Sequence, residues 1–175
     1  MNAKALLLAA TLGLLSPIVF AHGNQKHEPA KTTAGRDTAK ATLSIPPAAD
    51  DAVASVERFA SALSAGDLTQ AAGELDPTVL ILESGGVERS RDEYLGGHAK
   101  SDAAFLKTAQ ITLKRRTANT SGDLAWVASE SEIHAMKGTE LLMITSTETM
   151  VLQKSAQGWK IVHIHWSSRK AGGSH

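Results

Sequence analysis

The sequence contains no cysteine among its 175 residues, which excludes disulfide bonds, thiolate metal ligands and a cysteine nucleophile. It also lacks an excess of charge of either sign, because 18 Lys and Arg residues balance 18 Asp and Glu residues. This balance disfavours a general nucleic-acid-binding protein. Aromatic residues make up only 4% of the chain, with a single tyrosine. At 42% hydrophobic residues, the chain still suits one domain with its own core.

The first residues have the layout of a secretory signal peptide. Lys4 precedes an apolar run over residues 5–15, and Val19-Phe20-Ala21 offers a cleavage site. Ser16 and Pro17 interrupt the apolar segment, which falls short of the roughly 20 residues of a membrane span. We therefore expect cleavage after Ala21, a periplasmic or secreted mature chain, and no membrane partner afterwards.

Residues 22–47 have few large apolar side chains and predict a flexible leader that precedes the folded domain, expected at 48–169. We expect a disordered tail at 170–175. Cleavage after Ala21 would make His22 the first residue of the mature chain. Its amine and imidazole, with His27 nearby, form a candidate Cu(II) site.

Helices are predicted at the start of the domain. Asp50 can cap a helix that ends at Gly66, and Asp67 can cap a shorter one that ends near Leu75. The first helix carries one apolar stripe with spacings of three and four residues, formed by Val53, Val56, Phe59, Ala60 and Leu63. This stripe predicts that the helix packs on the core.

The rest of the chain predicts strands interrupted by one more helical region. Residues 79–83 and 87–89 suit a strand and its short return, and Ser90-Arg91-Asp92-Glu93 fits a capping box. Gly96-Gly97 should break the helix that follows. Turn-rich segments then separate four long strand candidates, at 110–118, 124–135, 140–153 and 159–168. The pattern predicts an α+β fold, in which the helices cover one face of a curved antiparallel sheet.

Two segments carry a family resemblance. The run V-L-I-L-E-S-G-G-V-E-R-S-R-D-E-Y-L-G-G-H, which starts at Val79, and G-W-K-I-V-H-I-H-W-S-S at 158–168 resemble the SnoaL-like branch of the nuclear transport factor two-like superfamily. The last strand is also similar to the association domain of calcium/calmodulin-dependent kinase. The resemblance covers about residues 50–169. It implies a cone-shaped α+β barrel, commonly dimeric, with a pocket between the helices and the concave sheet.

The resemblance leaves the chemistry open, because the superfamily includes ketosteroid isomerase, scytalone dehydratase, polyketide cyclases and binding modules without a reaction. Ketosteroid isomerase-like chemistry needs a tyrosine in the first helix, whereas Tyr94, the only tyrosine, falls in the third. Scytalone dehydratase-like chemistry needs tyrosines beside paired histidines. The resemblance implies no cofactor.

The last strand supplies the main candidate site residues. Strict alternation places His163 and His165 on one face with Trp159 and Ile161, and Ile164 and Trp166 on the other. By resemblance, the histidines should face the pocket, while Ile164 and Trp166 should contact a partner subunit. Imidazoles can donate, accept or transfer a proton near neutral pH. The alternative is that each histidine is an ordinary hydrogen-bonded core residue.

Glu83 shares a face with Val79 and Ile81 by alternation. If that face is inward, Glu83 with His165 is the best candidate general base, and otherwise Glu83 is a solvent-exposed strand end. Arg115 alternates with Ile111 and Leu113 and could meet a ligand carboxylate or lie at a solvated edge. The full set of expected pocket residues is Glu83, Tyr94, His98, Arg115, Trp126, His163 and His165.

The sequence therefore predicts an exported homodimeric domain that binds a small, partly apolar molecule. An alternative from another class is a proton-transfer enzyme, such as an isomerase, dehydratase or cyclase, that uses His163 or His165 with Glu83. A third is copper binding through His22. We expect neither nucleic acid nor membrane as a partner.

Overall fold

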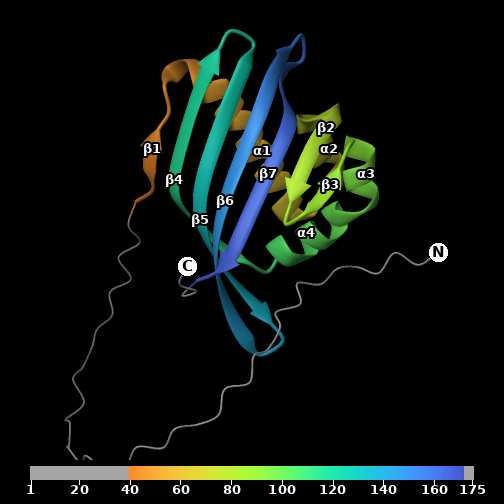
Figure 1. The fold of residues 1–175 in the computed structure, drawn as a ribbon, viewed down its shortest axis with the longest axis vertical. Coiled ribbons are helices and arrows are strands. Elements are labelled where there is room, and N and C mark those ends of the chain that lie inside the picture. The colour runs from red at the N-terminus through yellow and green to blue at the C-terminus, as the bar shows by residue number, and fades with distance from the viewer. Residues whose placement is uncertain (1–39, 172–175) are drawn as a thin grey trace, which may run out of the picture. The chain divides into compact units, whose positions relative to one another are not determined.

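Seven strands form one curved, unclosed sheet, and the helices cover one of its faces (Figure 1). The structure is a computed structural model that describes residues 40–171. In chain order the elements are β1 (Thr42–Ser44), η1 (Pro47–Ala49), α1 (Asp50–Ala65), α2 (Leu68–Glu74), β2 (Leu75–Glu83), β3 (Gly86–Glu88), α3 (Arg91–Gly96), α4 (His98–Leu106), β4 (Gln110–Ser121), β5 (Leu124–Lys137), β6 (Glu140–Ser155) and β7 (Gly158–Lys170). The predicted α+β class, with helices on one face of a curved sheet, is confirmed.

Helix α1 ends, and helix α2 begins, at the residues that the sequence predicts. Gly66 ends α1 with a φ of 78°, a left-handed conformation that glycine adopts without a side-chain clash. The Asp67 carboxylate then accepts a hydrogen bond of 2.9 Å from the Gln70 amide and caps α2. Of the five predicted stripe residues, Val53, Val56, Phe59 and Leu63 are buried in the core, whereas Ala60 is exposed. None of the described helices is both long and apolar enough to cross a membrane.

The segment from β2 to α4 is shaped by turn and capping residues. Ser84 and Gly85 both have positive φ, of 49° and 86°, as a two-residue type I′ hairpin requires. Ser90 Oγ accepts from the Glu93 amide at 3.1 Å, and the Glu93 carboxylate accepts from the Arg89 amide at 2.7 Å. In the predicted capping box, the Glu93 carboxylate thus bonds the amide of Arg89 rather than that of Ser90. The helix breaks at Gly97, between α3 and α4.

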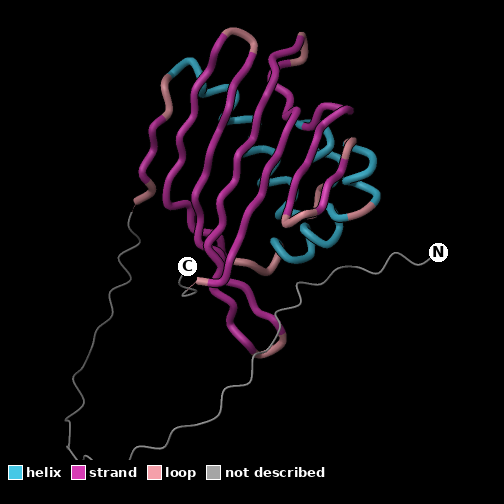
Figure 2. Tube along the Cα trace, in the orientation of Figure 1, coloured by secondary structure: helices cyan, strands magenta, loops and turns pink. Residues whose placement is uncertain are grey.

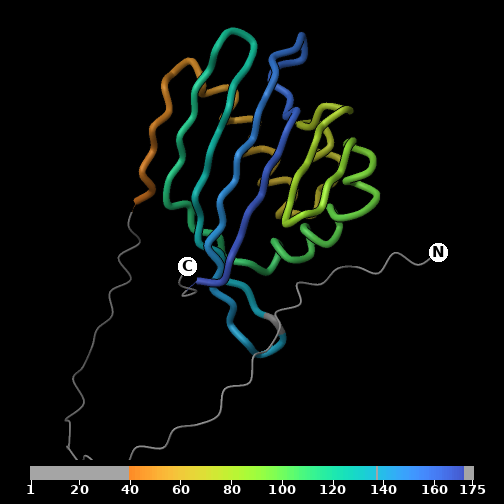
Figure 3. Tube along the Cα trace, viewed as in Figure 1, coloured from red at the N-terminus to blue at the C-terminus, as the bar shows by residue number. Residues whose placement is uncertain are grey.

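The strand order is β1-β4-β5-β6-β7-β2-β3. Strands β4 to β7 form the predicted antiparallel meander, while β7 pairs with β2 and β4 pairs with β1 in parallel. Figure 3 shows that β2 and β7, far apart in sequence, lie side by side. Strand β1 corrects the predicted leader, since residues 42–44 belong to the sheet rather than to a flexible segment.

The core lies between the helices and the sheet, and Figure 2 shows the helices against one face of the strands. Its sheet side includes a row of cross-strand neighbours, called here the core row, with exposed fractions of at most 4%: Ala118, Val127, Met150, Ile164 and Ile81. Side chains paired across neighbouring strands point to the same face. The core row therefore identifies the helix-covered face of each strand.

Two β-bulges change which residues lie on that face. Leu152 pairs with Ile161 but Val151 pairs with His163, so Val162 is an extra residue in β7. Likewise Leu113 pairs with Ser131 but Arg115 pairs with Glu130, so Lys114 is extra in β4. A bulge places two residues opposite one and so reverses the alternation beyond it.

Candidate functional site

A row of polar side chains follows the core row on the helix-covered face. It is defined by register, because Arg116 pairs with Ser129, Ser129 with Glu148, Glu148 with Trp166, and Trp166 with Glu83. This concave polar row crosses five strands, from β4 to β2. Each residue is two positions away from a member of the core row on the same strand, which explains why both rows share a face.

Arg116 ends the concave polar row on β4. It is only 9% exposed, and its guanidinium donates to Glu57 at 2.7 Å and to Ser129 Oγ at 3.2 Å. Glu57 belongs to α1, and its side chain is 63% exposed. A buried guanidinium is thus satisfied by a carboxylate that reaches in from the helix edge and by the neighbouring strand.

Trp166 and Glu148 form the centre of the row. The indole Nε1 donates a hydrogen bond of 2.8 Å to Glu148 Oε2, and the ring stacks on Phe59 of α1 with centroids 6.4 Å apart. Burial raises the pKa of Glu148, although the hydrogen bonds from Trp166 and Ser129 and the charge of Arg116 act to lower it. Glu148 is therefore a carboxyl group that holds its proton more tightly than a free one.

Tyr94 and Asp102 extend the site from the helices. The Tyr94 ring lies 6.1 Å from that of Trp166, and its hydroxyl donates to Asp102 Oδ2 at 2.9 Å. Burial raises the pKa of Asp102, and burial together with the charge of Asp102 raises the pKa of Glu83. Burial is also the main cause of the raised pKa of Tyr94. Three carboxyl groups around Trp166 thus have raised pKa values and hold their protons more tightly than free carboxyl groups do.

His98 lies at the edge of this cluster. Its Nδ1 hydrogen-bonds the buried carboxylate of Glu88 on β3, while the imidazole itself is 64% exposed. The hydrogen bond to Glu88 raises the pKa of His98. His98 therefore lies between the buried Glu88 carboxylate and solvent.

Beyond the concave polar row, the helices no longer cover the sheet completely. The next residues on this face are serines paired in register, Ser131 with Ser146 and Ser146 with Ser168, here called the serine row. Ile133 pairs with Ile144 one step further out. Ser131, Ser146, Ile133 and Ile144 are half-buried, and Phe105 at the end of α4 is exposed. The open end of this face is therefore polar inside and apolar at its rim.

The structure places three of the predicted pocket residues at this site. Glu83 shares the inward face of β2 with Val79 and Ile81, as the alternation predicts. Tyr94 is buried next to Trp166, and His98 lies at the edge. Whether these residues contact a ligand stays a prediction.

The predicted orientation of His163 and His165 is wrong. Ile164 is fully buried and Trp166 stacks on α1, so the two histidines point to the opposite, outer face. His163 Nδ1 hydrogen-bonds the Leu80 carbonyl at 2.8 Å, and His165 is exposed. The bulge at Val162 causes the reversal, because Ile161 and Ile164 both face the helices. Glu83 and His165 lie on opposite faces and cannot form the predicted couple.

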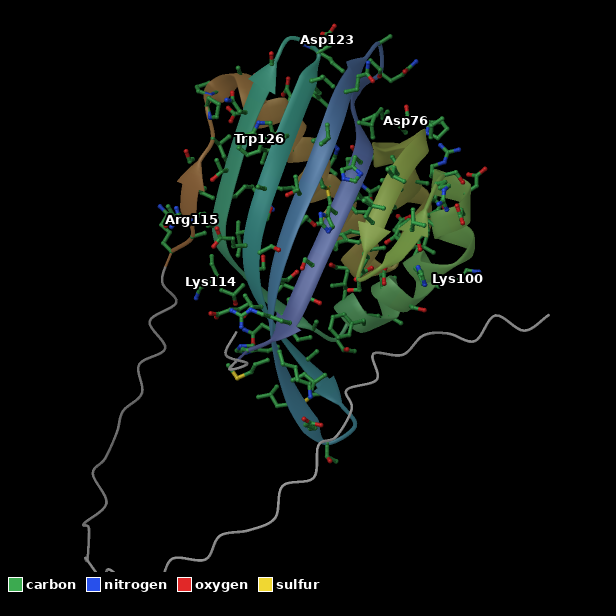
Figure 4. All side chains as sticks on the ribbon, viewed as in Figure 1. Asp76, Lys100, Lys114, Arg115, Asp123 and Trp126 are labelled. Carbon is green, nitrogen blue, oxygen red and sulfur yellow. The ribbon has the colours of Figure 1, made fainter. Side chains whose placement is uncertain are left out.

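Arg115 and Trp126 also lie on the outer face, contrary to the prediction (Figure 4). The bulge at Lys114 turns Arg116 inward in place of Arg115, which lies 3.6 Å from Glu130. Trp126 alternates with the buried Ala125 and Val127 and is 41% exposed. Its cross-strand neighbours on the outer face are Val151, His163 and Leu80.

The sequence reasoning did not propose Glu148, Arg116, Ser129 or Trp166 as site residues. Glu148 had a usable signal, because it alternates with Met150 and Leu152 in a strand without a bulge of its own. Arg116 and Trp166 could not be assigned to this face from the sequence, because each follows a bulge. His22 and His27 lie outside the described residues. Within residues 40–171, no group of three or more His, Asp and Glu residues is placed to hold a metal ion.

Replacing Glu148 should change how stability depends on pH. Because burial raises its pKa, the folded state binds more protons than the unfolded state above pH of about 4.3, so stability falls as pH rises. The E148Q variant lacks this titration and should lose less thermal stability than the wild type between pH 5 and 8. Melting temperatures measured across this range test it, with E132Q on the outer face as control. Parallel curves for E148Q and the wild type would contradict the assignment.

Comparison with known proteins identifies a family model and solved structures that are similar to this chain. The family model of the SnoaL-like domain matches residues 53–169. No curated protein matches the chain. Among solved structures, a proposed ketosteroid isomerase from Shewanella frigidimarina is 36% identical, with a TM-score of 0.65; the match covers 73% of this chain and 100% of that one.

Two more distant structures share the fold. A proposed dehydratase of the nuclear transport factor two-like family from Streptomyces avermitilis is 21% identical, covers 69% of this chain and 94% of its own, and has a TM-score of 0.60. A proposed calcium/calmodulin-dependent protein kinase II association domain from Xanthomonas campestris is 19% identical, covers 74% and 95%, and has a TM-score of 0.61. Proteins with these different descriptions share one architecture.

Proposed function

Because the chain belongs to the SnoaL-like domain family, we propose that it binds a small organic molecule on the helix-covered face of its sheet. The observation that carries this proposal is the concave polar row, where Arg116, Glu148 and Glu83 lie next to the apolar core row on the helix-covered face. Burying an ionisable group costs free energy, and buried groups with shifted pKa values are common at functional sites. Here they lie next to the part of the face that the helices leave open.

The chemistry of the open end indicates a ligand with an apolar body and a polar end. Ile133, Ile144 and Phe105 offer apolar surface at the rim, whereas Glu148 offers a hydrogen-bonding carboxyl group deeper on the same face. Ligand sites commonly combine apolar walls with a few placed polar groups that fix orientation. A molecule that enters from the rim would bring its polar end to Glu148.

The three tryptophans allow this proposal to be tested without mutation. Trp166 lies in the site, Trp126 on the outer face, and Trp159 in the core near the β6–β7 turn. In an NMR screen of small aromatic alcohols and ketones, fragments should shift the indole N–H signal of Trp166 and leave that of Trp126 in place. Hits that shift only Trp126, or a screen without any hit, would contradict a site on the helix-covered face.

A second candidate function is proton transfer on the bound molecule. Glu83 and Glu148 flank Trp166 in one row, and both have raised pKa values, as acid and base groups in active sites often do. Glu83 would take a proton from a carbon and return it to another, while protonated Glu148 would donate a hydrogen bond to the developing oxyanion. This assignment replaces the histidines in the enzyme alternative. The similar Shewanella frigidimarina protein, proposed to be a ketosteroid isomerase, supports it.

Turnover of a β,γ-unsaturated ketosteroid distinguishes binding from catalysis. If the domain is an isomerase, E83Q should lower kcat at least about 100-fold, the usual contribution of a general base. E132Q, on the outer face, should keep the wild-type rate. Wild-type protein that binds the steroid without converting it would reject the enzyme candidate and retain the binding proposal.

The proposal includes export and a homodimer. Residues 1–21 carry the signal-peptide pattern, and N-terminal sequencing of the mature protein would test cleavage after Ala21. The outer face has Trp126 and Leu80, which are 41% and 39% exposed, in one cross-strand row with His163. Burial of this row by a second copy is consistent with its composition. The W126K variant should then run as a monomer in light-scattering measurements, and an unchanged mass would reject this interface.

A further inference from the structure

The serine row presents hydroxyl groups that the described part of the chain leaves without partners. Ser131 and Ser146 pair across β5 and β6 and are half-buried on the helix-covered face. Neither hydroxyl makes a hydrogen bond to another described residue, whereas neighbouring Ser129 accepts from Arg116. No side-chain oxygen of the described residues is both fully buried and without a partner, so both serine hydroxyl groups are reachable from solvent. The two hydroxyls are thus free to bind a ligand.

Their distance from Glu148 follows from strand geometry. Ser146 precedes Glu148 by two residues on β6, so their Cα atoms are about 7 Å apart on the same face. Ser131 lies directly opposite Ser146, at about 5 Å between Cβ atoms. Each hydroxyl can donate or accept a hydrogen bond. An oxygen atom above this pair would therefore lie about 7 Å from one that contacts Glu148.

We propose that Ser131 and Ser146 are the specificity-determining residues of the concave site, and that they bind a second oxygen of a flat, largely apolar ligand whose first oxygen lies at Glu148. This inference rests on the proposed function and adds the ligand class to it. The ligand carries two hydroxyl or carbonyl oxygens at opposite ends of one edge. Ile133 and Ile144, one step further toward the rim, contact its apolar surface.

Three naphthalene derivatives test the inference by isothermal titration calorimetry. The probe 2,7-dihydroxynaphthalene has two widely separated hydroxyls, 2,3-dihydroxynaphthalene has adjacent ones, and 2-naphthol has one. The wild-type protein should bind the 2,7-isomer at least fivefold more tightly than the other two. The S131A/S146A double variant should lose that advantage and keep its affinity for 2-naphthol. S167A on the outer face should behave as the wild type does.

The possible outcomes distinguish a failure of this inference from a failure of the proposed binding function. If 2-naphthol binds and shifts the Trp166 indole signal, but the 2,7-isomer has no advantage or keeps it in S131A/S146A, the serines do not determine specificity and the site itself stands. If none of the three probes binds, both the inference and the binding site for this ligand class are overturned. Circular dichroism of each variant confirms that the fold is retained.

Discussion

Deletion of Val162 is expected to remove the bulge and to leave the domain folded. Without this extra residue, β7 would alternate regularly from Ile161 through His163 to Ile164, so Ile164 and Trp166 would still face the helices while His163 and His165 would stay on the outer face. The variant loses the packing of one half-buried valine and the local bend of the strand, so its stability should fall by about 1 to 3 kcal/mol.

Soluble yield and the circular dichroism spectrum of the deletion variant provide the measurement. The matched control is V162A, which keeps the bulge and removes only two methyl groups from a half-buried side chain on the outer face. It should stay folded and lose no more than about 1.5 kcal/mol. A deletion variant that does not fold would show that the bulge itself is required for the domain to form.

Replacement of Trp166 by alanine is expected to destabilise the domain by about 3 to 5 kcal/mol. The indole packs against Phe59 and Tyr94, so its removal leaves a cavity between α1, α3 and the sheet. It also removes the hydrogen-bond donor of Glu148, which leaves a buried carboxyl oxygen without that partner. Urea denaturation at neutral pH gives the free energy of unfolding.

The W166F variant separates the two contributions. Phenylalanine keeps much of the ring packing but has no N–H, so W166F should lose clearly less stability than W166A. A loss below about 1 kcal/mol in W166A would show that the ring is not a packing centre of the site.

Most of the fold could be predicted because local signals agree with the tertiary structure. The α1 stripe, the caps at Asp67 and Ser90, and the turn-rich segments between the long strands each depend on nearby residues. The last residues of the leader were missed because three exposed residues of β1 carry no apolar pattern. They join the sheet through backbone pairing with β4 alone.

The site was predicted only in part because its residues depend on register. Glu83 lies in a strand segment with regular alternation and was placed on the correct face. His163, His165 and Arg115 were assigned to the wrong face because each follows a bulge. No residue type marks a bulge in a β-rich run such as K-I-V-H-I-H, whose two faces are similarly apolar. Pairing partners from distant strands are needed to locate it.

The extra residue at Val162 bears on how relatives of this protein should be compared. A homologue whose final strand has the same residues but pairs without a bulge would present the equivalents of the two histidines on the helix-covered face, with the tryptophan on the outer face. Two sequences with nearly the same ending could therefore display opposite sets of functional groups. A homologue that lacks one residue at this point would instead keep the faces seen here, because its strand would alternate regularly from the equivalent of Ile161 to that of Ile164.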